Sequence, residues 1–229
     1  RTITSGPGSG SRVGAALVND PRINGVAFTG GTSTAWLINQ SLAARQTAIA
    51  PLIAETGGQN VMLVDSSALL EQVIADVLAS AFQSAGQRCS ALRVLLVQED
   101  VAPRLLELLQ GAMAALVIGD PACLATDVGP VIDREALHKL RLHAARMEKE
   151  ARLIYRCVLP ATCAQGTFFP PQAYEIKALT QLKDEVFGPI LHVLRYEDSQ
   201  LDAVIDAVNN TGYGLTFGIH SRIDSTVQH

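Results

Sequence analysis

The chain has 229 residues, of which 48% are hydrophobic and 17% charged, and its formal net charge is −4. This composition indicates a globular protein with a sizeable core, and the absence of a long basic run argues against a nucleic-acid partner. No apolar stretch approaches the roughly 20 residues of a membrane span, since the richest one, residues 105–118, is interrupted by Glu107 and Gln110.

A glycine-rich loop opens the chain at residues 6–11, and a short helix is expected over 13–18. A buried strand at 26–28 then leads into Gly30-Gly31-Thr32, and an amphipathic helix follows to about Arg45. This strand, glycine turn and helix form a nucleotide-site pattern, because the turn directs backbone N–H groups and a helix N-terminus at an anion.

The rest of the chain alternates between strand-like and helix-like segments. Further strands are expected at 49–54, 61–64, 92–97, 153–155, 168–169, 190–194 and 215–219. Helices are expected at 69–85, 101–116, 133–150 and 201–209, the first capped by Asp65-Ser66-Ser67 and the third charged and exposed. The alternation predicts an α/β fold with a mainly parallel sheet and a change of role near Gly57-Gly58.

The four cysteines are Cys89, Cys123, Cys157 and Cys163, and none has the spacing of a zinc ligand, so no metal site is expected. Cys157 and Cys163 allow one disulfide, but two free thiols are the simpler expectation. With no apolar signal segment at the N-terminus, we expect a reducing, cytoplasmic location.

Two motifs carry most of the chemistry. Cys89 lies in the polar, turn-forming run 84–90 after a long helix, and Glu55 opens the run 55–60 at a strand end. A lone cysteine is usually a core residue, and Glu55 by itself suggests a surface carboxylate before a plain turn. Together they supply a thiol that attacks a carbonyl and a carboxylate that activates water.

A third motif is Glu185-Val186-Phe187-Gly188-Pro189. It reads either as a strand entry marked by proline or as a cofactor contact, since a carboxylate suits a sugar diol and an aromatic ring suits a flat ligand.

The order and spacing of these three motifs resemble the aldehyde dehydrogenase superfamily, and the resemblance extends from about Val13 to the end of the chain. It implies an aldehyde dehydrogenase-like fold, with the C-terminal part of a Rossmann-type NAD(P)-binding domain over 1–56 and a catalytic domain, incomplete at its C-terminal end, over 57–229.

The resemblance also implies a role for each matched residue. Cys89 is the nucleophile, with its own backbone N–H as an oxyanion donor, and Glu55 is the general base. Gly57 lets the chain pass close to the nicotinamide. Glu185 accepts hydrogen bonds from the nicotinamide ribose, and Phe187 packs against that end of the cofactor.

The glycine turn departs from the family pattern. The family usually carries Phe-Thr-Gly-Ser-Thr, whereas this chain has Gly31 where the serine stands, and the fingerprint GxGxxG is absent. Phosphate binding at Gly30, Gly31 and Thr32 therefore depends on backbone N–H groups.

The run 81–93 resembles the branch of the family that oxidises glutamate γ-semialdehyde, and is most similar to the dehydrogenase domain of bifunctional proline utilization A proteins. In that branch a serine at the position of Ser90 helps bind the substrate carboxylate. The implied reaction converts L-glutamate γ-semialdehyde to L-glutamate in proline breakdown.

The resemblance further implies NAD as cofactor, with NADP left open, and FAD only in a proline dehydrogenase domain outside this chain. We expect a fragment of a homo-oligomeric parent that is inactive by itself. Two alternatives remain: an aldehyde dehydrogenase of another substrate class, and a truncated, non-catalytic product. A Cys–His hydrolase is disfavoured because no histidine is marked as a partner of Cys89.

Overall fold

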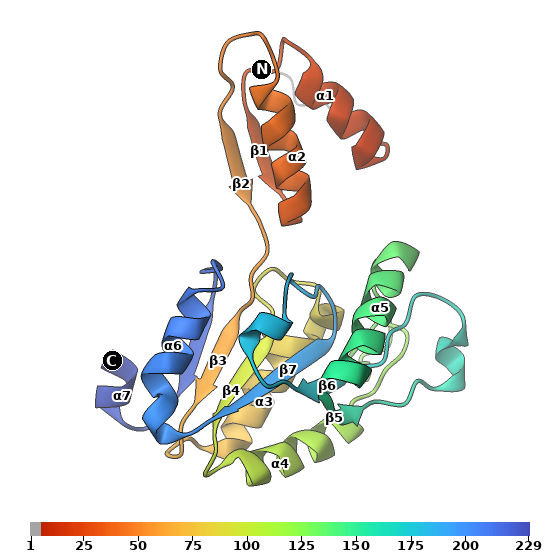
Figure 1. Cartoon of the computed structure of the whole chain (residues 1–229). Coiled ribbons are helices and arrows are strands. Elements are labelled where there is room, and N and C mark those ends of the chain that lie inside the picture. Colours follow the sequence, from red (N-terminus) through yellow and green to blue (C-terminus); the bar gives the residue numbers. More distant parts are fainter. Residues whose placement is uncertain (1–5) are drawn as a thin grey trace. The chain divides into compact units, whose positions relative to one another are not determined.

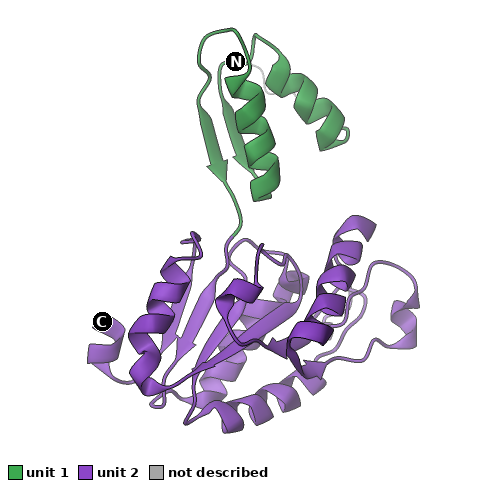
Figure 2. Cartoon of the chain, viewed as in Figure 1, with its two compact units in different colours: residues 1–57 green, residues 58–229 purple. Residues whose placement is uncertain are grey.

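The computed structural model describes residues 6–229 (Figure 1). The chain forms two compact units, residues 1–57 and residues 58–229 (Figure 2). Among the described residues, no helix combines the length and the apolar character needed to cross a membrane.

Unit 1 is a single strand–helix–strand element. Strands β1 (Val26–Thr29) and β2 (Leu52–Glu55) pair in parallel, and α2 (Thr32–Ala43) connects them. The short helix expected at 13–18 is present as α1 (Ala15–Asn19), but it begins later because the preceding residues form a wider π turn, η1 (Gly10–Gly14). Arg45 ties the end of α2 to α1 and to the segment after it, since its guanidinium donates to the carbonyl oxygens of Val18 at 3.3 Å and Ile23 at 2.8 Å.

Unit 2 is built on a six-stranded sheet in the order β5-β6-β7-β4-β3-β8. Its strands are β3 (Val61–Val64), β4 (Val94–Gln98), β5 (Arg152–Arg156), β6 (Gln172–Glu175), β7 (Ile190–Tyr196) and β8 (Phe217–His220). All neighbouring pairs are parallel except β5 with β6. The expectation of an α/β fold with a mainly parallel sheet is therefore confirmed.

Helices cover this sheet on both faces. The principal ones are α3 (Leu70–Phe82), α4 (Ala102–Ala114), α5 (Arg134–Glu150) and α6 (Leu201–Asn209), and a short α7 (Asp224–Gln228) ends the unit. The β3–α3–β4 and β7–α6–β8 connections cross the sheet in opposite directions, so right-handed crossovers place α3 and α6 on opposite faces (Figure 1).

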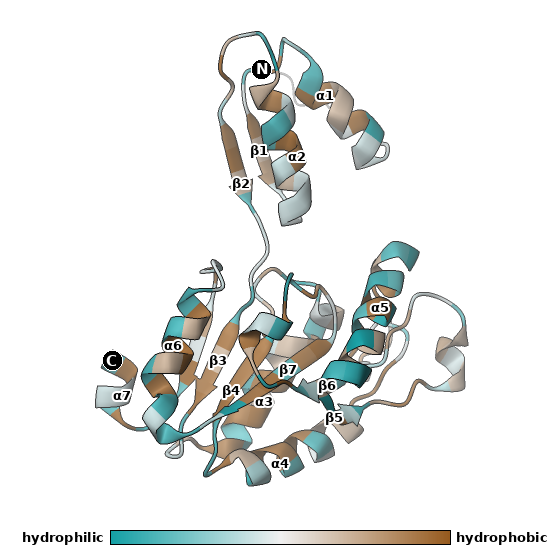
Figure 3. Cartoon of the chain, in the orientation of Figure 1, coloured by the Kyte–Doolittle hydropathy of each residue, from teal (hydrophilic) through white to brown (hydrophobic). Residues whose placement is uncertain are grey.

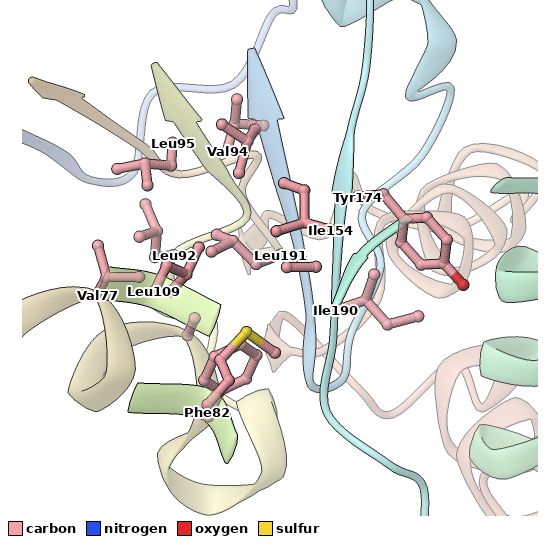
Figure 4. Close-up of a cluster of buried hydrophobic side chains, with 14 of the residues drawn as sticks. Val77, Phe82, Leu92, Val94, Leu95, Leu109, Ile154, Tyr174, Ile190 and Leu191 are labelled. Atoms are coloured by element: carbon pink, nitrogen blue, oxygen red, sulfur yellow. The ribbon is translucent and has the colours of Figure 1, made fainter. Parts of the chain in front are cut away.

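The core lies where α3 and α4 pack on the central strands. Every residue of β3 and β4 is buried, and all of these residues are hydrophobic except Gln98 at the end of β4 (Figure 3). Figure 4 shows Val77 and Leu109 of the two helices beside Leu95 and Leu191 of the sheet. Continuous apolar strands are what a parallel sheet covered on both faces requires.

Helix α5 is polar over much of its surface (Figure 3). It was expected to be exposed, but Leu137, Leu140, Ala144 and Met147 are buried at helical spacing. The expectation therefore holds for only one face of this helix, and its apolar stripe packs on the core.

The strand expected at 168–169 was wrong. Phe169 is buried in an irregular segment, and the strand is β6, which begins after Pro170-Pro171. Prolines have no N–H to donate to a sheet ladder, and the polar ends of β6 (Gln172 and Glu175) concealed its strand character.

The cap expected for α3 was also wrong, since its N-cap is Leu69 and makes no side-chain hydrogen bond. The Asp65 carboxylate instead accepts the N–H and O–H of Ser67 at 2.8 and 2.6 Å, and the O–H of Ser221. Asp65 thus joins the carboxyl end of β3 to the segment after β8.

Two histidines that are far apart in sequence meet beside the sheet. His143 of α5 and His192 of β7 approach at 2.9 Å between their Nε2 atoms, and His192 Nδ1 lies 3.1 Å from the Arg93 carbonyl oxygen. That carbonyl can only accept, so His192 carries its proton on Nδ1 and accepts from His143. Burial lowers the pKa of His192 to about 3 and that of His143 to about 4.

This pair predicts acid sensitivity. An unfolded histidine binds a proton below about pH 6.5, whereas these two remain neutral in the folded state until about pH 4. The unfolded state therefore binds more protons across this window, and the free energy of unfolding falls as the pH is lowered through it. Urea titrations between about pH 7 and pH 4 measure this loss.

The matched variants are the double substitution His143→Gln with His192→Gln, and His138→Gln on the exposed face of the same helix. The double variant is expected to lose most of the pH dependence and His138→Gln to retain it. An unchanged slope in the double variant would contradict the assignment.

Candidate active site

Unit 1 brings four of the predicted residues to one edge of its sheet. Gly30, Gly31 and Thr32 form the turn between β1 and α2, with Gly31 as the N-cap of that helix. Glu55 ends β2 opposite Thr29, and its carbonyl accepts the Gly30 N–H at 3.1 Å. The exposed Glu55 carboxylate and the α2 N-terminus thus share the carboxyl edge of two parallel strands, the place where such units bind nucleotides. Gly57, half-buried, ends the unit.

Unit 2 brings together the other predicted residues, at the amino ends of its central strands. Cys89 and Ser90 precede β4, and Glu185 and Phe187 precede β7, which pairs with β4 in parallel. Asn60 precedes β3 on the other side of β4. Because the three strands are parallel neighbours, the segments that enter them lie side by side.

The Cys89 loop, residues 83–92, begins where α3 breaks. The helix expected to reach residue 85 ends at Phe82, and Ser84, Ala85 and Gly86 follow with φ of 55°, 51° and 64°. An L-residue pays roughly 1–2 kcal/mol for this left-handed conformation, so the surrounding structure must impose it. The turn leaves Cys89 and Ser90 exposed at its far end.

The buried side chain of Asn60 holds the Cys89 loop from the β3 side. Its Nδ2 donates to the carbonyl oxygens of Cys89 and Ala91 at 2.6 and 2.8 Å. Its Oδ1 accepts the Thr216 N–H at 3.2 Å, so the amide orientation is determined by partners at both ends.

Arg93 holds the same loop from the β7 side. Its guanidinium donates to the carbonyl oxygens of Gly86 at 2.7 Å, Arg88 at 3.0 Å and Gly188 at 3.2 Å, and to Glu185 Oε1 at 3.3 Å. The side chain is fully buried, and burial lowers its pKa while Glu185 opposes that shift. An arginine remains protonated even so, which places a permanent positive charge beneath the loop.

The Arg93 guanidinium also contacts two residues of the Glu185 motif, Glu185 and Phe187. The Glu185 side chain is 14% exposed, and the Arg93 guanidinium lies 5.3 Å from the centre of the Phe187 ring, a cation–π distance. Phe187 itself is 44% exposed, so its ring is available to a ligand.

Comparison with known proteins identifies the family. The family model described as "Aldehyde dehydrogenase family" matches residues 3–229. The chain belongs to the aldehyde dehydrogenase family. This confirms the family that the three motifs suggested, and membership implies the use of NAD or NADP as cofactor.

The chain is similar to proteins of this family that are considerably longer than it. The bifunctional protein PutA of Klebsiella aerogenes is 51% identical over 96% of this chain, and the 1-pyrroline-5-carboxylate dehydrogenase of Geobacillus kaustophilus is 34% identical over 94%. A crystal structure of a bifunctional proline utilization A protein superposes with a TM-score of 0.91 at 55% identity, over 95% of this chain. The chain spans only 18%, 42% and 22% of these three proteins.

Sequence reasoning about this aldehyde dehydrogenase chain missed Asn60 and Arg93. Each is a polar residue directly before a buried apolar strand, and Arg93 interrupts the apolar run from Ala91 to Val97. A charge within such a run signals a buried, paired group, but its partners are up to 95 positions away. The cysteines behave as expected, since Cys157 and Cys163 are free thiols.

The left-handed turn yields a stability prediction. A Cβ on Gly86 would lie 2.4 Å from the Gly188 carbonyl oxygen, and its φ is one that L-residues avoid. Gly86→Ala should lower the free energy of unfolding by at least about 1–2 kcal/mol, measured by urea denaturation. The control, Gly111→Ala in α4, has nothing within 4 Å and should raise it by about 0.5–1 kcal/mol. Equal effects would refute the predicted clash.

Proposed function

We propose that the protein containing this chain oxidises an aldehyde to a carboxylate with NAD(P)+ through a covalent intermediate on Cys89, and that its substrate is L-glutamate γ-semialdehyde. One observation carries the proposal: an exposed thiol lies on a loop that is held through its backbone by Asn60 and Arg93, beside the Glu185 motif. A fixed backbone around an exposed nucleophile suits covalent carbonyl chemistry.

In the first half-reaction the Cys89 thiolate adds to the aldehyde carbonyl and gives a thiohemiacetal. The negative charge on its oxygen needs a hydrogen-bond donor, and within the described residues no group accepts the Cys89 N–H, so this donor remains open. A bound NAD(P)+ would accept the hydride from the substrate carbon, which would leave a thioester on Cys89.

In the second half-reaction Glu55 acts as the general base. It takes a proton from water, and the resulting hydroxide adds to the thioester carbonyl. The adduct then breaks its C–S bond, which restores the Cys89 thiolate and releases the carboxylic acid, whose proton passes to solvent. The exposed position of Glu55 at the end of β2 supports this role, since a base must reach solvent.

The residues present fit a dinucleotide. Arg93 occupies one oxygen of Glu185, which leaves Oε2 for the ribose hydroxyls, and the exposed Phe187 ring offers a flat surface to that end of the cofactor. Gly30, Gly31 and Thr32 form the turn at the N-terminus of α2 and would hold the pyrophosphate through backbone N–H groups, and Gly57 would let the chain pass close to the nicotinamide. We propose NAD as the cofactor, with NADP as the alternative.

The substrate assignment rests on Ser90 and on the relatives. Ser90 is exposed beside the nucleophile, where its hydroxyl can donate to a substrate carboxylate. The names of the similar proteins, PutA and 1-pyrroline-5-carboxylate dehydrogenase, point to the same branch. An aldehyde dehydrogenase of another substrate class is the alternative, and it would have no use for this hydroxyl.

For the whole protein we propose a cytoplasmic homo-oligomer, fused to a proline dehydrogenase that carries FAD. The 229-residue chain by itself is expected to lack activity, because it spans 18% of its bifunctional relative. Turnover by the isolated chain would contradict this expectation, and a truncated product that folds without any catalysis remains the second alternative.

The proposed mechanism predicts the effect of removing the nucleophile. In the complete protein, Cys89→Ala should abolish NAD+ reduction with glutamate semialdehyde, because it removes the thiol that we assign to thioester formation. The control Cys123→Ala alters another exposed cysteine and should leave turnover unchanged. NADH absorbance measures both, and activity in Cys89→Ala would refute the mechanism.

The second prediction concerns substrate choice. Ser90→Ala should raise KM for glutamate semialdehyde about tenfold through loss of one hydrogen bond to a charged group, while KM for propanal, which has no carboxylate, stays constant. Equal changes for both aldehydes would favour the alternative substrate class.

A further inference from the structure

The peptide bond between Arg88 and Cys89 is held at its carbonyl end and open at its amide end. The Arg88 carbonyl oxygen accepts Arg93 Nη2 at 3.0 Å and the Ala91 N–H at 3.1 Å, whereas within the described residues nothing accepts the Cys89 N–H. A peptide unit is planar and its C=O and N–H point in opposite directions, so fixing the oxygen fixes the direction of the N–H.

The next peptide bond is held from the other side. The carbonyl oxygen of Cys89 accepts Nδ2 of Asn60 at 2.6 Å. Both peptide planes that flank the Cys89 Cα therefore have a buried side-chain donor, one from the start of β3 and one from the start of β4. Together they determine the backbone conformation of the nucleophile without contacting its thiol.

Arg93 also connects this arrangement to the cofactor motif. The same Nη2 lies 3.3 Å from Glu185 Oε1, and Nη1 bridges the carbonyl oxygens of Gly86 and Gly188. The Arg93 side chain is only 2% exposed, so its guanidinium cannot turn toward water without breaking these bonds. A movement of Glu185 would therefore change the hydrogen bond at the Arg88 carbonyl oxygen, because Arg93 Nη2 contacts both groups.

We propose that Arg93 is a positioning residue that orients the Cys89 N–H as the oxyanion donor and couples its orientation to Glu185. This inference deepens the proposed function, since it concerns the same Cys89 and Glu185 site. Arg93 acts through the backbone and does not touch the reacting atoms.

Two reactions of the Cys89 thiol separate orientation of the donor from exposure of the sulfur. With p-nitrophenyl acetate, the thiolate adds to the ester carbonyl, an oxyanion forms, and p-nitrophenolate leaves an acetyl thioester on Cys89. With iodoacetamide, the thiolate displaces iodide directly and no oxyanion forms. Only the first reaction needs the N–H donor, and neither uses NAD(P)+ or an aldehyde.

The test uses the complete protein, with modification of Cys89 followed by peptide mass analysis. Arg93→Lys keeps the charge but loses the forked donor. We expect acylation of Cys89 to slow about tenfold or more while alkylation changes by less than about twofold. Arg195→Lys, a cation paired with Glu99 on the sheet, is the matched control and should alter neither rate. Alkylation of the exposed Cys123 serves as the internal reference.

Glu185→Gln tests the coupling and leaves Arg93 in place if Arg93→Lys does not fold. It should slow acylation by about two- to threefold without slowing alkylation, because Arg93 loses its charged partner. Equal slowing of both reactions, or no effect on either, would overturn the proposal by showing that these residues only maintain the loop or do not act on it. Because no aldehyde is involved, these outcomes are independent of whether glutamate semialdehyde is the substrate.

Discussion

One buried cation, Arg93, organises the loops around Cys89 in unit 2. The Arg93 guanidinium is excluded from water, and a charge in that position must be matched by acceptors or it would destabilise the fold. Its acceptors are backbone carbonyls from two loops and one carboxylate, Glu185. Meeting the electrostatic requirement of Arg93 therefore also fixes the loop that carries Cys89 and the motif that carries Glu185.

The sheet makes this arrangement available. In unit 1 the glycine turn and Glu55 lie at the carboxyl ends of parallel strands, as is usual for nucleotide-binding units. In unit 2 the grouped residues lie at the amino ends instead, because Asn60, Cys89 and Glu185 each precede one of three adjacent strands. A parallel register keeps those entry points side by side, and the side chains of Asn60 and Arg93 bridge between them.

The backbone of the Cys89 loop adopts an unfavourable conformation. Three consecutive left-handed residues end α3 and turn the chain toward Cys89, and two of them, Ser84 and Ala85, are not glycine. Gly86, the third, packs so closely on Gly188 that a Cβ would not fit. Strain of this kind persists only where the surroundings impose it, and Arg93 contributes by donating to the Gly86 carbonyl oxygen.

The sequence by itself determined the α/β class, most helices and strands, the family, and the candidate residues Cys89, Glu55 and Glu185. Those conclusions depend on local patterns: apolar runs, glycine turns and short motifs with a fixed order. The same reasoning failed at β6, where prolines and polar ends hid a strand, and at Asp65, whose carboxylate binds Ser221 rather than capping a helix.

Only the tertiary structure decided how the Cys89 loop is supported. Asn60 and His192 pair with segments that are remote in sequence, and Arg93 joins its own loop to the remote residues Glu185 and Gly188, so no local pattern contains these contacts. Their pairing depends on strand order and register, which result from packing of the whole sheet. The residues that perform the proposed chemistry could therefore be identified from the sequence. Those that orient them could be identified only from the arrangement of the strands in the sheet.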